Sequence, residues 1–231
     1  MYKRQIFVNP LQFNQSTDFD SYPRPIDDDL RICAAAGVTA VYAPTASAMY
    51  PATFQTHVEP GALADRLEGP MRPGHFRGVA TVVTKLLGAT RADVAAFGEK
   101  DYQQLALIRR MVADLDLDVE IVGVPIVREP DGIALSSRNV RLTPAARDAA
   151  VVLSQALTLV RDAYERGERE ADALRSIATT HVSSEPLASL EYVDVVDPDT
   201  LEPVDRADAP TSVLVAAWFG DVRLIDNALL G

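Results

Sequence analysis

The segment FGEKDYQQLALIRRM, residues 97–111, combines residue types that could bind a phosphate group. A short apolar run, DVAAF (93–97), precedes it and predicts a buried strand that ends at Gly98. A glycine at the end of a strand lets a ligand approach the backbone closely. Lys100 would add positive charge beside a helix N-terminus, where backbone N–H groups already favour anions. The spacing is therefore compatible with a phosphate site.

The same residues also fit a helix cap. Asp101 is a favourable N-cap residue, and Gln104 three positions later completes a capping-box pattern. The cap explains these two residues but leaves Gly98 and Lys100 without a role. Both interpretations stay open on the spacing alone.

A second polar segment, ALSSRN (134–139), could be an anion clamp or an ordinary turn. Ser136 and Ser137 place two hydroxyls beside Arg138, whose guanidinium can bind a phosphate through two parallel hydrogen bonds. Gln12 follows a strand end and could hold a hydroxyl or a carboxylate, although its local pattern is weak.

Other candidate side chains have simpler explanations. Asp28 and Asp29 could hold a divalent cation, but acids are common in a first helical turn because the helix dipole favours them. The three histidines, His57, His75 and His181, show no metal-ligand spacing. Of these, only His75 could line a pocket. The single cysteine, Cys33, reads as a core residue of a helix and fits a reducing cytoplasm.

Charge and hydropathy exclude two classes of partner. A net charge of −11 argues against a nucleic-acid binder, which needs a basic face for phosphates. No apolar run approaches the ~18 residues that a membrane span needs. A locally basic pocket for a small anion remains compatible with this charge.

Strands and helices alternate in the first half, which predicts an α/β fold with a parallel sheet. The predicted strands are 6–8, 38–44, 93–97 and 119–127, and the predicted helices are 25–36, 63–69, 78–89 and 101–115. The run 119–127 is continuously apolar, as in a strand buried on both faces. Ligands of such sheets bind beyond the carboxyl ends of the strands, where Gly98 and Lys100 would lie.

The pattern changes after residue 127. The turn EPDG (129–132) comes first, and Thr143 followed by Pro144 then predicts a helix start. The predicted helices are 144–166 and 168–182, and the predicted strands are 190–196, 212–219 and 222–230. We therefore expect one domain over residues 1–127 and a smaller α+β domain over 128–231.

Taken together, these segments resemble the pantothenate synthetase family, whose members are pantoate–β-alanine ligases. The matching stretches are IFVNPLQF, DFDSYPRPIDDDL, GHFRGVATVVTKLL, FGEKDYQQLALIRRMV, VGVPIVREPDGIALSSRN and SVLVAAWFGDVRLIDN. The resemblance implies a Rossmann-like nucleotide-binding domain with a C-terminal lid domain. It also implies that ATP, with Mg²⁺, activates pantoate as an adenylate, which β-alanine converts to pantothenate, a coenzyme A precursor, with release of pyrophosphate and AMP.

Residue roles follow from the resemblance by motif. The residues that would bind ATP are Gly98, Glu99, Lys100, Asp101, Val127, Leu135, Ser136, Ser137 and Arg138. Four of these would be catalytic: Lys100, Ser136, Ser137 and Arg138. Gln12 and Gln104 would bind pantoate or β-alanine, and the metal ligands stay open. The family resemblance also implies a cytoplasmic homodimer.

One family feature is missing from the sequence. The family pattern starts with a strand and an H-x-G-H signature at a helix N-terminus, and none of the histidines here falls in such a motif. We therefore expect the first strand and helix to be absent and residues 1–5 to lie outside the fold. Two alternatives stay open: a chain that binds pantoate without catalysis, and a related nucleotidyltransferase with another substrate.

Overall fold

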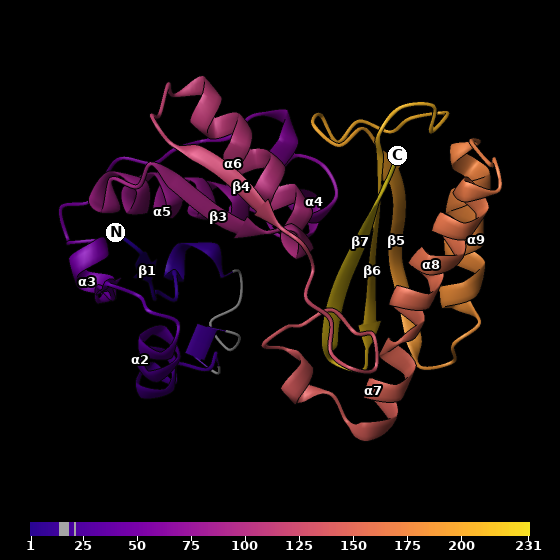
Figure 1. Cartoon of the computed structure of the whole chain (residues 1–231), viewed down its shortest axis with the longest axis horizontal. Coiled ribbons are helices and arrows are strands. Elements are labelled where there is room, and N and C mark those ends of the chain that lie inside the picture. The colour runs from indigo at the N-terminus through magenta and orange to yellow at the C-terminus, as the bar shows by residue number, and fades with distance from the viewer. Residues whose placement is uncertain (14–18, 21) are drawn as a thin grey trace. The chain divides into compact units, whose positions relative to one another are not determined.

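Figure 1 shows the computed structural model of the chain, which describes residues 1–13, 19–20 and 22–231. These residues form two compact units. Unit 1 comprises Met1–Ala96 and Leu107–Val122, and unit 2 comprises Phe97–Ala106 and Gly123–Gly231. The predicted domain boundary between residues 127 and 128 stays a prediction, because a compact unit need not be an independently folding domain.

The division into units passes through three elements. These are strand β3 (Val94–Gly98), helix α6 (Tyr102–Asp114) and strand β4 (Glu120–Val124). Between β3 and α6 lies η3 (Glu99–Asp101), a short 3-10 helix that belongs to unit 2. The segment with the candidate phosphate residues is therefore grouped with the C-terminal half of the chain.

Unit 1 contains short paired strands. Strand β1 (Lys3–Gln5) pairs in parallel with β2 (Ala40–Tyr42), and β3 pairs with β4. The predictions of a strand at 6–8 and of residues 1–5 outside the fold were wrong. The strand lies earlier because the chain turns at η1 (Pro10–Gln12), whose proline cannot donate a ladder hydrogen bond.

Several helical segments lie wholly within the described part of unit 1, and those near residues 25–36 and 78–89 were predicted from the sequence. They are α2 (Ile26–Ala35), α3 (Ala46–Met49), η2 (Ala62–Ala64), α4 (Glu68–Met71) and α5 (His75–Thr90). The single helix predicted at 63–69 is wrong, because Leu67 has a φ of 50° and separates η2 from α4. The matched stretch that starts at residue 18 includes Asp18 and Ser21, which lie outside the described residues.

Strand β4 is not buried on both faces, contrary to its sequence pattern. It ends at Val124, one residue before Pro125, and its residues alternate between exposed and half-buried. Val122 and Val124 are 37% and 41% exposed. An apolar run fixes neither the length of a strand nor the coverage of its faces, because both depend on the elements that pack against it.

Unit 2 is built on an antiparallel sheet in the order β5 (Ala188–Val196), β6 (Thr211–Phe219) and β7 (Val222–Leu230). The hairpin between β6 and β7 turns at Gly220, where a φ of 65° favours glycine. All three strands were predicted from their apolar runs, and these predictions are confirmed.

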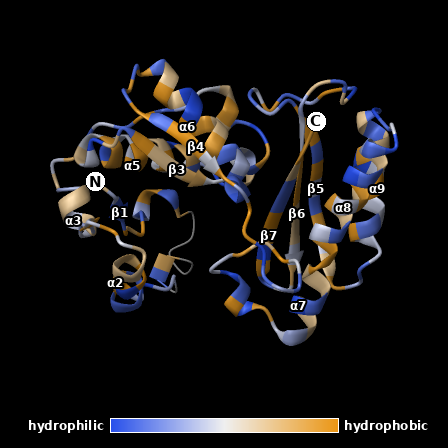
Figure 2. Cartoon of the chain, in the orientation of Figure 1, coloured by the Kyte–Doolittle hydropathy of each residue, from blue (hydrophilic) through white to orange (hydrophobic). Residues whose placement is uncertain are grey.

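Three helices accompany this sheet. They are α7 (Pro144–Ala150), α8 (Val152–Glu165) and α9 (Ala171–Ser183), and α8 and α9 pack together beside the strands (Figure 1). Figure 2 shows the mixture of hydrophobic and hydrophilic residues along α8 and α9 that suits one buried and one exposed face. Fully buried core residues include Val160, Leu174 and Val215. Thr143 caps α7 as predicted, since its hydroxyl accepts the Ala146 N–H at 3.2 Å.

Cys33 is buried in α2, as its pattern predicted. In the described part of the chain, no helix is long and apolar enough to cross a membrane.

Candidate active site

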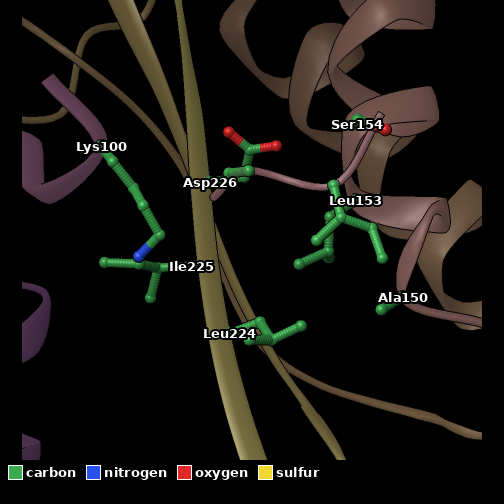
Figure 3. Close-up of a pocket in the computed structure, with 9 residues that line it drawn as sticks. Lys100, Ala150, Leu153, Ser154, Leu224, Ile225 and Asp226 are labelled. Atoms are coloured by element: carbon green, nitrogen blue, oxygen red, sulfur yellow. The ribbon is translucent and has the colours of Figure 1, made fainter. Parts of the chain in front are cut away.

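The predicted phosphate residues form a tight turn after β3. Helical structure begins at Glu99, two residues before the predicted cap at Asp101, and continues from η3 into α6. Glu99 and Lys100 are half-buried, and Asp101 is exposed. Lys100 lines a small pocket of unit 2 together with Ile225 and Asp226 of β7 (Figure 3). The turn thus presents one cation at a helix start, where an anion is favoured.

A closed loop follows β4 and carries the second set of predicted residues. Leu135 N–H donates to the Val127 carbonyl at 2.8 Å, and Arg128 and Ala134 form an antiparallel bridge. The predicted turn at 129–132 is confirmed, since Gly132 N–H donates to the Glu129 carbonyl at 2.8 Å. The backbone therefore brings together the two apolar residues assigned to ATP.

Both apolar side chains at the closure of this loop are exposed. Val127 is 60% exposed and Leu135 is 56% exposed. Such side chains offer a surface on which a planar aromatic group can lie with loss of water contact. This arrangement is compatible with an adenine contact, and it joins residues that lie eight positions apart in the sequence.

The serine and arginine residues continue directly from the loop into η4 (Asn139–Arg141). The Ser136 hydroxyl accepts the Arg138 N–H at 3.2 Å, and the Ser136 carbonyl accepts the Asn139 N–H at 3.1 Å. The Ser136 oxygen is thus tied to its own backbone, while its hydroxyl proton can still be donated to an anion. Ser137 is exposed and Arg138 is half-buried.

Ion pairs brace the loop against α7. Arg147 contacts both Glu129 and Asp131 at 2.6 Å, and Asn139 Nδ2 donates to Glu129 Oε1 at 2.6 Å. The hydrogen bond from Asn139, followed by that from Arg147, lowers the pKa of the Glu129 carboxyl below its ordinary value. The Glu129 carboxylate is therefore charged at neutral pH, and its ion pair with Arg147 fixes the loop to α7.

Gln12, in unit 1, is held by a buried asparagine that no local sequence pattern distinguishes. Asn9 Nδ2 donates to Gln12 Oε1 at 3.2 Å and to the Gly78 carbonyl at 3.0 Å. Asn9 Oδ1 accepts the Tyr50 hydroxyl at 2.8 Å. Because Oε1 of Gln12 faces Asn9, its Nε2 group is oriented to donate elsewhere, which suits a carboxylate or hydroxyl ligand.

His75, which could line a pocket by its sequence position, contacts the segment that carries Gln12. It is buried at the start of α5, and its Nδ1 lies 2.8 Å from the Gln12 carbonyl oxygen. It therefore contacts the backbone that carries Gln12. Gln104 lies on α6 and is half-buried. It belongs to unit 2, whereas Gln12 belongs to unit 1.

The acidic pair that could have held a cation lies in the first turn of α2, where Asp28 pairs with Arg31. Among the residues that the structure describes, no group of three or more histidine, cysteine, aspartate or glutamate side chains could hold a metal ion.

An α/β chain with parallel strand pairing, a positively charged turn at a helix start and a serine–arginine loop is typical of nucleotide-binding proteins. The family model described as pantoate-beta-alanine ligase matches residues 4–229. The chain belongs to this family, whose members are ligases that join pantoate to β-alanine through a C–N bond.

Individual relatives agree with the family match. The pantothenate synthetase of Geotalea daltonii is 51% identical over 226 residues, which cover 98% of this chain and 80% of that protein. The solved pantothenate synthetase of Thermus thermophilus is 44% identical with a TM-score of 0.94, over 98% of this chain and 82% of that one. The fold is therefore the Rossmann-like fold of this family.

A second solved relative carries ligands. The pantoate-beta-alanine ligase of Francisella tularensis, solved in complex with beta-gamma ATP and beta-alanine, is 33% identical with a TM-score of 0.78. The match covers 98% of this chain and 78% of that one.

Proposed function

We propose that this chain condenses pantoate with β-alanine at the expense of ATP, through a pantoyl-adenylate intermediate. The family match over residues 4–229 carries the proposal, because it includes every residue assigned to ATP or pantoate. A pantoate carboxylate oxygen attacks the α-phosphorus, and the bond to pyrophosphate breaks. The β-alanine amine then attacks the acyl carbon and loses a proton, and AMP leaves as the C–N bond forms.

Charge stabilisation is the main task of the protein in such a reaction. Lys100 places its ammonium group on the phosphates, and Arg138 adds a guanidinium that can bind two oxygens. Ser136 and Ser137 donate hydroxyl hydrogen bonds to the same phosphates. The tie between Ser136 and the Arg138 N–H supports this role, because it holds the segment in one turn.

The remaining assigned residues bind the other parts of the substrates. Gly98, Glu99 and Asp101 line the nucleotide, with Asp101 toward the ribose, while Val127 and Leu135 contact the adenine. Gln12 and Gln104 hold pantoate and orient it for both steps. The fixed amide of Gln12 supports this assignment, since a donor suits a hydroxy acid.

Mg²⁺ enters the proposal with ATP. The ion usually binds substrate phosphates with one or two carboxylates, keeps several waters, and neutralises charge on the transferred group. Asp101 and Glu99 are the carboxylates that lie in the same turn as Lys100. We also propose a cytoplasmic homodimer, to be tested by sedimentation equilibrium.

The deciding experiment is AMP release by this chain with ATP, Mg²⁺, pantoate and β-alanine, each omitted in turn. Release that needs both pantoate and β-alanine is the expected result. Lys100→Ala should lower kcat/KM by about 100-fold, the size of losing one transition-state donor. Arg110→Ala is the matched control, since Arg110 is an exposed cation that pairs with Asp114 on the same helix. AMP retained on the product would point instead to a related nucleotidyltransferase.

A second candidate function is pantoate binding without catalysis. It is favoured by the lack of an H-x-G-H motif around any of the histidines in the sequence. Calorimetry separates the two functions: pantoate binding without AMP release, unchanged by Lys100→Ala, supports binding alone. AMP release would refute it.

A further inference from the structure

Two adjacent residues of β7 each contact one of the two segments of unit 2 that carry residues assigned to ATP. Asn227 contacts the Lys100 turn, and Asp226 contacts the loop 128–138. We propose that they are positioning residues, which set the separation between the Lys100 turn and the 128–138 loop. This inference rests on the proposed function for its consequence, although its structural part can be tested independently.

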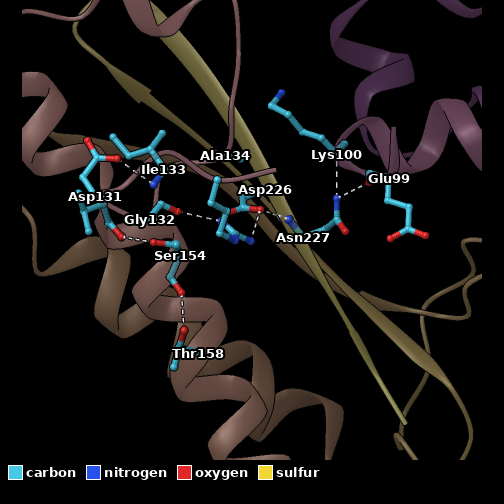
Figure 4. A network of polar contacts seen from close by, with 12 residues as sticks. Glu99, Lys100, Asp131, Gly132, Ile133, Ala134, Ser154, Thr158, Asp226 and Asn227 are labelled. Carbon is cyan, nitrogen blue, oxygen red and sulfur yellow. Dashed lines mark hydrogen bonds and ion pairs between the residues drawn. The ribbon is translucent and has the colours of Figure 1, made fainter. Parts of the chain in front are cut away.

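The Asn227 side chain binds the backbone of the Lys100 turn. Its Nδ2 donates to the Glu99 carbonyl at 2.9 Å and to the Lys100 carbonyl at 3.0 Å. Both hydrogens of the side-chain amide are therefore used, one for each carbonyl. The contacts leave the Lys100 and Glu99 side chains to extend from the turn in different directions (Figure 4). Asn227 is itself buried, so its loss would remove two hydrogen bonds made by a side chain that water reaches little.

Asp226 holds the start of the loop. Arg128 Nη1 donates to Oδ2 at 2.6 Å, and Nη2 donates to Oδ1 at 3.0 Å. The Asp226 side chain is 2% exposed, so this fork provides the charge pairing that a buried carboxylate needs. Arg128 Nη1 also donates to the Gly132 carbonyl at 3.1 Å, which joins the same ion pair to the turn of the loop.

The two contacts lie on opposite sides of one strand. Successive side chains of a strand point to opposite faces, so Asp226 and Asn227 reach in opposite directions. Figure 4 shows this arrangement, with the Lys100 turn on one side of β7 and the residues around Ala134 on the other. Within unit 2, a single dipeptide therefore sets how far the cation of the turn lies from the serine–arginine segment.

A purely structural role makes a different prediction. If the pair only stabilised the sheet, any substitution in the sheet that lowers the free energy of unfolding by the same amount would have the same effect on ligand binding. If the pair positions the loops, each substitution should loosen one segment and leave the other unchanged. Segment-specific loosening is therefore the property that separates the two explanations.

The test uses the full chain and three variants. Asn227→Leu removes both amide donors at similar volume, and Asn227→Ala replaces it if leucine prevents folding. Asp226→Asn keeps the shape but loses one acceptor and the charge. Val195→Ala is the matched control, since Val195 is fully buried in β5, which does not pair with β7, and its truncation should lower stability alone.

Amide hydrogen exchange and calorimetry with a non-hydrolysable ATP analogue and Mg²⁺ are the readouts. We expect Asn227→Leu to speed exchange at 98–101 only, and Asp226→Asn to speed exchange at 128–138 only. Each should weaken analogue binding by about tenfold, which corresponds to about 1.4 kcal/mol. Val195→Ala should lower the unfolding temperature without selective exchange and without loss of affinity.

Loosening of both segments by each variant, or of neither, would overturn the inference, as would an equal affinity loss in Val195→Ala. If the unmodified chain binds no analogue, the proposed function fails. The exchange pattern then still supports or overturns the positioning of the two segments.

Discussion

Replacement of Gly78 by alanine should destabilise unit 1, although alanine is normally the more favourable residue within a helix. Gly78 lies in the first turns of α5, where its carbonyl accepts a hydrogen bond from Asn9. A Cβ at this position would lie 2.3 Å from the Leu11 carbonyl oxygen and 2.9 Å from the Gln12 nitrogen. These atoms are backbone, so η1 must move by about 1 Å to restore ordinary contact. Gln12 would move with it.

The expected free energy follows from two opposing effects. Alanine favours a helix over glycine by about 1 kcal/mol, while overpacking against a rigid neighbour costs about 1–3 kcal/mol or more. Since the overlap here is with main-chain atoms, the cost should exceed the gain, and we expect a net loss of about 2 kcal/mol. A displacement of about 1 Å at a substrate-positioning residue can also cost on the order of 100-fold in catalysis.

Gly88 of the same helix supplies the control. A Cβ there would have no neighbour within 4 Å, so Gly88→Ala should stabilise unit 1 by about 0.5–1 kcal/mol. Urea unfolding of both variants measures the difference in stability, and calorimetry with pantoate tests the proposed role of Gln12. Equal stability of the two variants would refute the close approach of α5 and η1, and unchanged pantoate affinity in Gly78→Ala would refute the proposed role of Gln12.

Three further substitutions test other contacts. Burial raises the pKa of Tyr50 to about 12, so its contribution to stability is complete below about pH 10 and lost as the pH rises through 12; Tyr50→Phe should flatten that alkaline loss in urea unfolding. Asn139, then Arg147, lowers the pKa of Glu129, so its contribution is present above about pH 4.3 and lost at lower pH; Glu129→Gln should make unfolding less sensitive to acid. Thr143→Ala should lower the free energy of unfolding by about 1 kcal/mol, whereas Thr143→Ser should preserve it.

Local patterns predicted most elements of this chain. The apolar segment 78–89 predicted most of α5, the 3–4 spacing of apolar residues predicted α6, and the apolar runs before and after Gly220 predicted β6 and β7. Predictions failed where distant contacts decide the outcome. The exposure of Val122 depends on what covers β4, which the run 119–127 does not encode.

The site shows the same limit. Lys100 and Ser136 lie in compact motifs, so their residue types and spacing could suggest an anion site. The residues that hold such motifs act across long separations: Asn9 lies 69 positions from Gly78, and Asn227 lies 127 positions from Lys100. Asn9 precedes a proline, a pair that indicates an ordinary turn. Asn227 lies inside an apolar strand, where no local pattern indicates a function. Only the fold identifies the carbonyls that these amides reach.

The turn after β3 separates two contributions to ligand binding that a double-mutant cycle can measure. Lys100→Ala removes the charge but keeps the carbonyl that Asn227 binds, whereas Asn227→Leu keeps the charge but releases the turn. If Asn227 acts by placing the Lys100 ammonium, its loss should matter less once that ammonium is gone. We expect a coupling energy of about 1 kcal/mol for binding of the ATP analogue, the size found for residues in one network. Additive effects of the two substitutions would show that Asn227 stabilises the turn without placing its cation.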